Sequence, residues 1–146
     1  MSSSNPQKII IIGAGISGLI LAQYLRKSSI PFQIFERDAS LDARPGGWGL
    51  TLHWSLPALR ELLPPEIVAK LPEAYVNKEA ARSGDNGRFQ FFDLHTGHAK
   101  YDVPAAERIR VSRYRLKKIL AEGIDVQVRS IQLIAQLDRV SSIPYE

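Results

Sequence analysis

The residue types and spacing best suited to chemistry lie near the start of the chain. Gly13, Gly15 and Gly18 come directly after a run of four isoleucines, and Glu36 ends the next apolar run. Glycines let the backbone approach a diphosphate closely, and a carboxylate about 20 residues further on can accept hydrogen bonds from ribose hydroxyls. This combination predicts a site for the ADP part of a dinucleotide.

Each of these residues has a separate expected task. Gly13 permits a tight turn, Gly15 leaves no side chain between the backbone and a pyrophosphate, and Gly18 lets a helix pack closely on a sheet. A carboxylate at Glu36 also repels a 2′-phosphate, so we expect that the nucleotide is not NADP. Without its flanking elements, the glycine motif would fit a flexible loop equally well.

Three elements must position this motif. Lys8–Ile12 is continuously apolar, which predicts a strand buried on both faces. Apolar residues at helical spacing from Ile16 onward predict a well-covered helix, which the turn Ser28–Pro31 ends. Phe32–Phe35 then predicts a parallel strand. In this arrangement the helix directs its free N–H groups and the positive end of its dipole toward the phosphates.

A second glycine-rich segment lies in the loop Asp38–Gly49. Arg44, Gly47 and Gly49 surround Trp48, and such glycines let the backbone approach a flat ligand. The alternative is an ordinary connection, because glycine and proline also mark turns without a function.

The middle of the chain predicts elements that support the site. Leu50–Leu52 fits a short strand, and Ser55 is placed to cap a helix that ends before Pro64. Phe89–Val103 predicts an aromatic hairpin, which either covers a core or forms one wall of a substrate pocket. Val76–Arg88 has no pattern that supports a prediction.

The third segment with candidate binding residues is Arg108–Val128. A brief strand is expected to lead into a helix over Arg113–Glu122, with Ser112 as its cap and Gly123 at its end. A further strand should follow at Asp125–Val128. Arg113 would lie in the first helical turn, near a pyrophosphate, although a surface arginine on a basic helix is the alternative.

Composition excludes several classes of site. The 146 residues include no cysteine, so disulfides, thiolate metal sites and a cysteine nucleophile are ruled out. His53, His95 and His98 are scattered, so we expect no metal site, and no Ser/His/Asp arrangement is found. The net charge of +4 comes with a basic cluster between residues 108 and 118, which fits a solvated helix face. No nucleic-acid motif accompanies it.

The start of the chain does not have the pattern of a secretion signal. Residues 1–7 lack the basic and apolar parts of a secretion signal, and the isoleucine run is too short to cross a bilayer. We therefore expect a flexible lead-in at residues 1–7, no membrane contact and a cytoplasmic protein.

Taken in order, three motifs resemble the N-terminal part of an FAD-dependent monooxygenase of the para-hydroxybenzoate hydroxylase type. They are IIIIGAGISGLILAQYL with IFER, RPGGWGLTL before a helix, and RVSRYRLKKIL. The resemblance implies an α/β, partial Rossmann-like FAD-binding fold with a parallel βαβ core and a β-hairpin insertion. It assigns cofactor contacts to eight positions. These are Gly13, Gly15, Gly18, Glu36, Arg44, Gly47, Gly49 and Arg113.

The resemblance also implies a reaction. In such enzymes NADPH reduces FAD, and the flavin then uses dioxygen to hydroxylate or epoxidise a small aromatic or polyketide-like metabolite. Two further FAD motifs of the family are missing after the third motif, and the only Gly-Asp pair, Gly84-Asp85, lies elsewhere. Residues 8–146 are thus expected to form a single, incomplete FAD-binding domain whose catalytic residues are not identified.

Two other hypotheses stay open. One is a truncated pseudoenzyme that binds nucleotide without turnover. The other is an interaction module, because three parallel strands without a fourth leave a sheet edge that natural proteins normally cover. That edge would dock on a longer flavoprotein or on a second copy of the chain.

Overall fold

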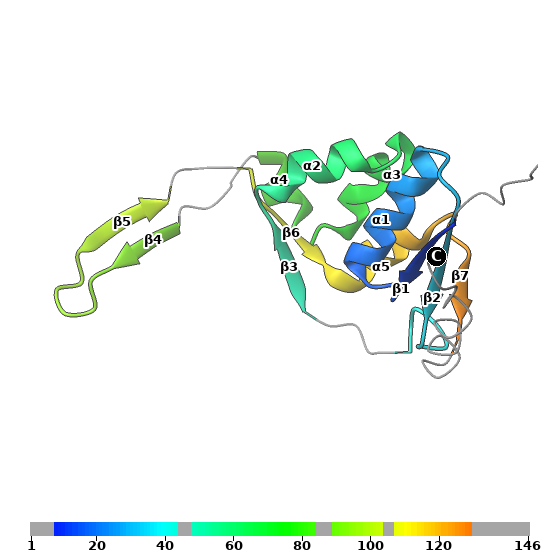
Figure 1. Ribbon diagram of the computed structural model, residues 1–146. Coiled ribbons are helices and arrows are strands. Elements are labelled where there is room, and N and C mark those ends of the chain that lie inside the picture. Colours follow the sequence, from blue (N-terminus) through cyan, green and yellow to red (C-terminus); the bar gives the residue numbers. More distant parts are fainter. Residues whose placement is uncertain (1–7, 44–47, 84–88, 104–106, 130–146) are drawn as a thin grey trace, which may run out of the picture.

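The predicted β-α-β unit is present in the computed structural model, which describes residues 8–43, 48–83, 89–103 and 107–129 (Figure 1). It consists of β1 (Ile9–Ile12), α1 (Ile16–Lys27) and β2 (Phe32–Glu36). The two strands are parallel, with Ile9 opposite Phe32. The expected lead-in at residues 1–7 and the weakly patterned residues 130–146 lie outside the described part.

A third parallel strand, β7 (Val126–Val128), pairs with β2 and confirms the prediction for this segment. The order of the described sheet is β1-β2-β7, so β1 lies at its edge. This arrangement confirms the predicted α/β class with a parallel βαβ core.

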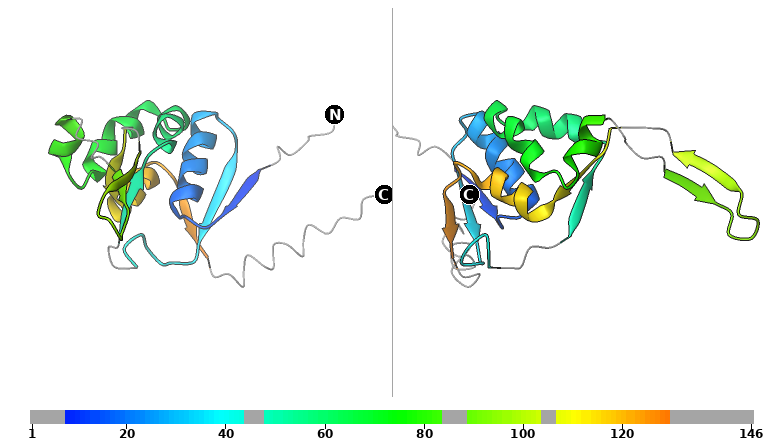
Figure 2. Two further views of the ribbon diagram at one scale, coloured as in Figure 1. Left: turned by 90° about the vertical axis from the view of Figure 1, so that its left-hand side faces the viewer. Right: turned by 180° about the vertical axis from the view of Figure 1, so that it is seen from behind.

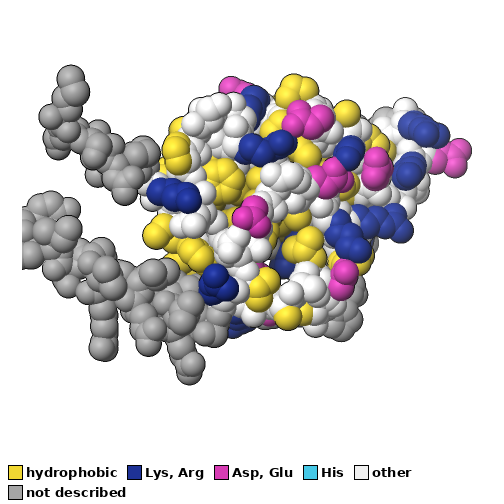
Figure 3. Space-filling view, turned by 90° about the vertical axis from the view of Figure 1, so that its right-hand side faces the viewer, with side chains coloured by type: hydrophobic (Ala, Val, Ile, Leu, Met, Phe, Trp, Pro, Cys, Tyr) yellow, Lys and Arg dark blue, Asp and Glu magenta, His cyan; other side chains and the backbone are white. Residues whose placement is uncertain are grey.

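The prediction that β1 is buried on both faces is wrong. Ile11 is 6% exposed, whereas Ile10 and Ile12 are 53% and 67% exposed. The helices lie on one side of this sheet (Figure 1), and an edge strand has a strand neighbour on one side only. The space-filling view from the sheet side shows hydrophobic side chains at the surface among charged ones (Figure 3).

A second, two-stranded sheet joins segments that are far apart in the sequence. β3 (Gly49–Leu52) pairs antiparallel with β6 (Ile109–Ser112), and both strands confirm their predictions. Tyr75 forms an isolated bridge with Val111 of β6. This pairing brings the second and third sequence motifs side by side.

The remaining helices lie between and after these strands. They are α2 (Ser55–Leu62), α3 (Pro65–Lys70), the 3-10 helix η1 (Leu71–Ala74), α4 (Lys78–Ser83) and α5 (Arg113–Ala121). The expected cap at Ser55 is wrong, because Ser55 is the first helical residue and Trp54 precedes it without a side-chain cap bond. None of the helices in the described ranges has the length and apolar character needed to span a bilayer.

The predicted hairpin is formed by β4 (Phe89–Phe92) and β5 (Ala99–Val103). It stands away from the helices and from the three-stranded sheet in every view (Figures 1 and 2). Phe91 and Tyr101 contact each other, with ring centroids 6.3 Å apart, yet both are more than half exposed. The hairpin therefore does not cover the core of the described structure, and a role as a pocket wall stays a prediction.

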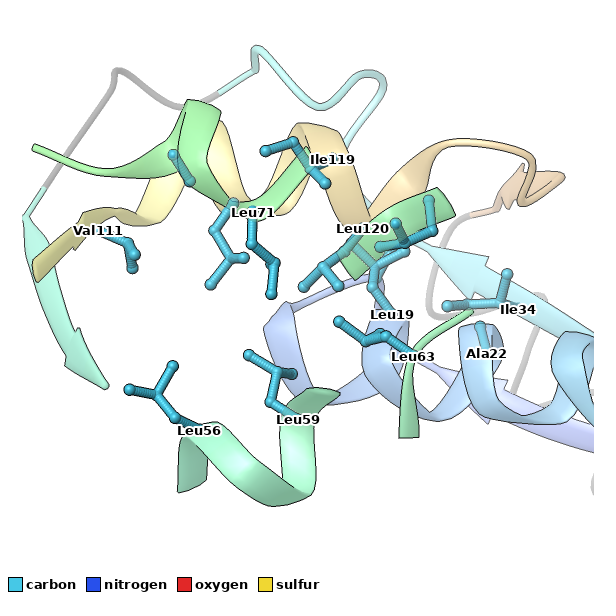
Figure 4. Packing of buried hydrophobic residues seen from close by; sticks show 14 of the residues in the cluster. Leu19, Ala22, Ile34, Leu56, Leu59, Leu63, Leu71, Val111, Ile119 and Leu120 are labelled. Atoms are coloured by element: carbon cyan, nitrogen blue, oxygen red, sulfur yellow. The ribbon is translucent and has the colours of Figure 1, made fainter. Parts of the chain in front are cut away.

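The core lies between the helices and the helix-facing side of the sheet (Figure 4). Leu19 of α1, Ile34 of β2 and Leu120 of α5 are fully buried in it. The predicted inward positions of α5 are confirmed, and η1 contributes Leu71 to the same cluster. By contrast, the prediction of a well-covered α1 is wrong at two positions. These are Leu21, which is 44% exposed, and Tyr24, which is 41% exposed.

Candidate nucleotide-binding site

The glycine-rich turn begins directly at the end of β1. Gly13 has a φ of +99°, a backbone conformation that residues with a Cβ rarely adopt. Its N–H group donates to the carbonyl oxygen of Phe35 at 2.7 Å, so the turn is tied to the end of β2. The structure confirms the tight turn predicted at this position.

Gly18 and Gly15 differ in the space around them. A Cβ placed on Gly18 would lie 2.1 Å from the carbonyl oxygen of Gly13, which confirms that α1 packs closely against the turn. A Cβ on Gly15 would meet nothing within 4 Å. Gly15 is also the N-cap residue of α1, and as a glycine it has no side chain that could cap the helix. The first turn of α1 is therefore open to an anion at Gly15.

Glu36 holds the two ends of the β-α-β unit together. Its Oε2 atom accepts a hydrogen bond from the backbone N–H of Ala14 at 2.8 Å. Its Oε1 atom accepts from the N–H groups of Arg37 at 2.8 Å and Asp38 at 3.1 Å. A carboxylate has about four acceptor positions, so Glu36 retains about one for a ribose hydroxyl.

This environment keeps the Glu36 carboxylate charged. Partial burial acts to raise the pKa of this carboxyl, but the N–H groups of Asp38, Ala14 and Arg37 together outweigh it. The positive charge of Lys117 on α5 acts in the same direction, and the pKa lies below the ordinary value of 4.5. At neutral pH the group is therefore an acceptor only.

The second and third motifs meet where β3 pairs with β6. Gly49 lies opposite Ser112, and the N–H group of Arg113 donates to the carbonyl oxygen of Trp48 at 3.4 Å. A Cβ on Gly49 would lie 2.8 Å from Nε of Arg110, so glycine leaves room for this arginine to cross the strand. The predicted cofactor contact of Gly49 stays a prediction.

Helix α5 starts as the sequence predicts. The Ser112 side chain accepts a hydrogen bond from the N–H of Arg115 at 3.4 Å, and Gly123, with a φ of +71°, follows the end of the helix. Arg113 is the first helical residue and its side chain is exposed. Arg44 and Gly47 lie outside the described residues.

Asp42 connects α5 to the segment that follows β2, a contact that sequence reasoning missed. Its Oδ1 atom accepts a hydrogen bond from the Tyr114 hydroxyl and pairs with Lys118 Nζ at 3.2 Å. Lys118 also lies 4.6 Å from the Tyr114 ring centroid. The hydrogen bonds of Tyr114 and Lys118 hold the pKa of the Asp42 carboxyl below its usual range. No local pattern around Asp42 signals this contact, because its partners lie on α5.

Comparison with known proteins places these features in context. Residues 11–57 match the model of a family described as NAD(P)-binding Rossmann-like domain. A protein named "Probable FAD-dependent monooxygenase" from Arthroderma benhamiae is 50% identical over 96% of this chain and 33% of its own length. The FAD-dependent monooxygenase dbaB of Emericella nidulans is 45% identical over 81% of this chain and 30% of its own length.

A solved structure agrees with these relatives. A protein from Photorhabdus luminescens described as a "putative FAD containing monooxygenase" has a TM-score of 0.58 and 31% identity, over 82% of this chain and 30% of that chain. The parallel β-α-β unit and the glycine turn are features of a Rossmann-like domain. More particularly, the chain is related to FAD-dependent monooxygenases, which confirms the resemblance drawn from the three motifs. It spans about a third of the length of these relatives.

Proposed function

We infer that this chain binds FAD through its ADP moiety and supplies the dinucleotide-binding part of an FAD-dependent monooxygenase. The observation that carries the proposal is the hydrogen bond between Glu36 and Ala14, which places an ionised carboxylate beside the glycine turn. The open space at Gly15 and the exposed Arg113 support it. Relatives named FAD-dependent monooxygenases support the choice of FAD.

The residues of this chain would bind and orient the cofactor. Backbone N–H groups at the start of α1 would donate to the diphosphate, and Gly15 would let it approach. Glu36 would accept one ribose hydroxyl at its remaining acceptor position. Arg113, at the start of α5, would pair with the diphosphate from the other side. FAD would supply the redox chemistry.

We propose that the whole reaction is an NAD(P)H-driven hydroxylation or epoxidation of a small aromatic or polyketide-like metabolite. The relatives named FAD-dependent monooxygenases support the class of reaction, whereas the reductant and the substrate class rest on the resemblance of the three motifs. A second proposal is an interaction module, which the exposed Ile10 and Ile12 of edge strand β1 favour. It predicts association of the purified chain through β1, which sedimentation measurements would detect.

A comparison of the original chain with its Gly15→Ala variant tests nucleotide binding separately from folding. Gly15→Ala adds a methyl group where the structure has open space, at φ −75° and ψ 179°, which alanine adopts readily. We expect an unchanged melting temperature and at least about tenfold weaker FAD binding, because the methyl group would separate the backbone from the pyrophosphate. Titration of FAD fluorescence measures the affinity. Equal affinity in the variant and the original chain would contradict the proposed role of the glycine turn.

A further inference from the structure

The segment that follows β2 is tied at its start to the carboxylate of Glu36. The backbone N–H groups of Arg37 and Asp38 donate to Oε1 of Glu36 at 2.8 Å and 3.1 Å. A third hydrogen bond, to Oε2, comes from the N–H group of Ala14 on the glycine turn. The direction in which Glu36 presents its remaining acceptor position therefore depends on where the backbone of residues 37 and 38 lies.

The same segment is tied to helix α5 near its other end. Asp42 Oδ1 accepts a hydrogen bond from the Tyr114 hydroxyl and lies 3.2 Å from Nζ of Lys118. Tyr114 and Lys118 are four positions apart, so they lie one above the other on α5. The Lys118 ammonium is also 4.6 Å from the Tyr114 ring centroid, so the two partners of Asp42 support each other. Although Asp42 is exposed, two successive turns of one helix hold it.

The chain between these two anchors is short and has no regular structure. Residues 37–43 belong to no helix or strand, and the N–H group of Ala43 donates to the carbonyl oxygen of Ser40 at 3.2 Å. Such connecting segments are more mobile than the elements that they join. Helix α5 is fixed, because its Leu116 and Leu120 are fully buried in the core. Contact with α5 therefore restricts the positions that the segment can take.

We propose that Asp42 is a positioning residue for nucleotide recognition, which anchors the segment after β2 on α5 and so orients the Glu36 carboxylate toward a ribose hydroxyl. The inference rests on the proposed nucleotide binding and adds to it a residue that touches no ligand. Asp42 acts through the backbone of Arg37 and Asp38, whereas Glu36 contacts the sugar. Asp42 thus affects recognition of the ribose and not of the diphosphate, which the glycine turn would bind.

Titrations of the 146-residue chain with ADP and with 2′,3′-dideoxy-ADP test this inference, because the second compound lacks both ribose hydroxyls. We expect the original chain to bind ADP at least about tenfold more tightly, because the dideoxy compound cannot donate to the charged acceptor Glu36. Asp42→Ala should reduce this preference at least about threefold and leave the affinity for the dideoxy compound within about twofold. Calorimetry measures the four dissociation constants.

Two further variants separate positioning from a general effect on the fold. Asp42→Asn keeps an oxygen that can accept from the Tyr114 hydroxyl, so it should retain most of the preference for ADP. Glu66→Ala is the matched control, because it removes an exposed ion pair between α1 and α3, in which Arg26 Nη2 lies 2.6 Å from Glu66 Oε1. The preference of this control should stay within about twofold of the original value.

The possible results separate the role of Asp42 from nucleotide binding itself. If Asp42→Ala kept the preference for ADP within about twofold, the role of Asp42 would be wrong and the proposed nucleotide binding would stand. An equal fall in Asp42→Ala and Glu66→Ala would also overturn the inference, because it would show a general effect of lost ion pairs. Equal affinities of the original chain for the two compounds would contradict the ribose contact of Glu36. If the original chain bound neither compound, the proposed nucleotide binding would itself be wrong.

Discussion

Gln23 offers a sharp test of how helices α1 and α5 are held together. It is the fully buried polar side chain of α1, and its Nε2 atom donates to the carbonyl oxygens of Leu120 and Glu122, each at 2.8 Å. Its Oε1 atom accepts from Arg26 Nε at 3.0 Å. Gln23 therefore satisfies carbonyl groups at the end of α5 that have no partner within the helix.

Gln23→Leu keeps a similar volume but removes all three hydrogen bonds. The buried Leu120 carbonyl loses its partner at a cost of about 1–3 kcal/mol, and the two partly exposed groups add about 1 kcal/mol together. The apolar surface of leucine offsets about 1 kcal/mol of this loss. The net destabilisation is about 2 kcal/mol, which lowers the melting temperature by roughly 6 °C in a chain of this size.

Thermal unfolding followed by circular dichroism measures this effect. The matched control is Gln127→Leu, because the Gln127 side chain donates a local, exposed hydrogen bond to Asp125. The control should change stability by less than about 0.5 kcal/mol. Melting temperatures within about 1 °C of each other for the two variants would refute the argument that Gln23 joins α1 to α5.

Three further outcomes are expected. Gly18→Ala should lower the melting temperature by several degrees, about 2 kcal/mol or more, because its Cβ would press on the Gly13 carbonyl. Ser29→Gly should raise stability by about 0.5–1 kcal/mol in a urea titration, because Ser29 has a φ of +56°. Glu36 has a folded-state pKa below its ordinary value, so its contribution is present above pH 4.5 and is lost as the pH falls through the folded pKa. Melting temperatures of Glu36→Gln should therefore depend less on pH in this acid range, and an unchanged slope would count against the backbone hydrogen bonds.

The predicted elements of the site are close to those of the structure, because their signals are local. The end of α1 at Lys27, the cap of α5 at Ser112 and its termination at Gly123 each depend on residues within one turn. Burial was harder to predict. The isoleucine run of β1 reads as doubly buried, yet the exposure of Ile10 and Ile12 depends on which elements lie beside the strand.

Contacts between residues that are far apart in the sequence could not be predicted from local sequence patterns. Asp42 and Tyr114 are 72 positions apart, and Gln23 and Leu120 are 97 apart. Gln23 falls at helical spacing in the sequence, but only the position of α5 makes it a hydrogen-bond donor to that helix. The effect of Lys117 on the pKa of the Glu36 carboxyl likewise arises only in the folded chain.

The sequence by itself determined the glycine turn, the acid that follows it and the β-α-β order around them. These features follow from backbone freedom at Gly13, close packing at Gly18 and hydrophobic periodicity, which act over a few residues. The tertiary structure alone decided that Glu36 accepts a hydrogen bond from the N–H of Ala14 and that α5 contacts Asp42. The physical reason is that hydrogen bonds and charges act through space, between elements that only the packed core brings together.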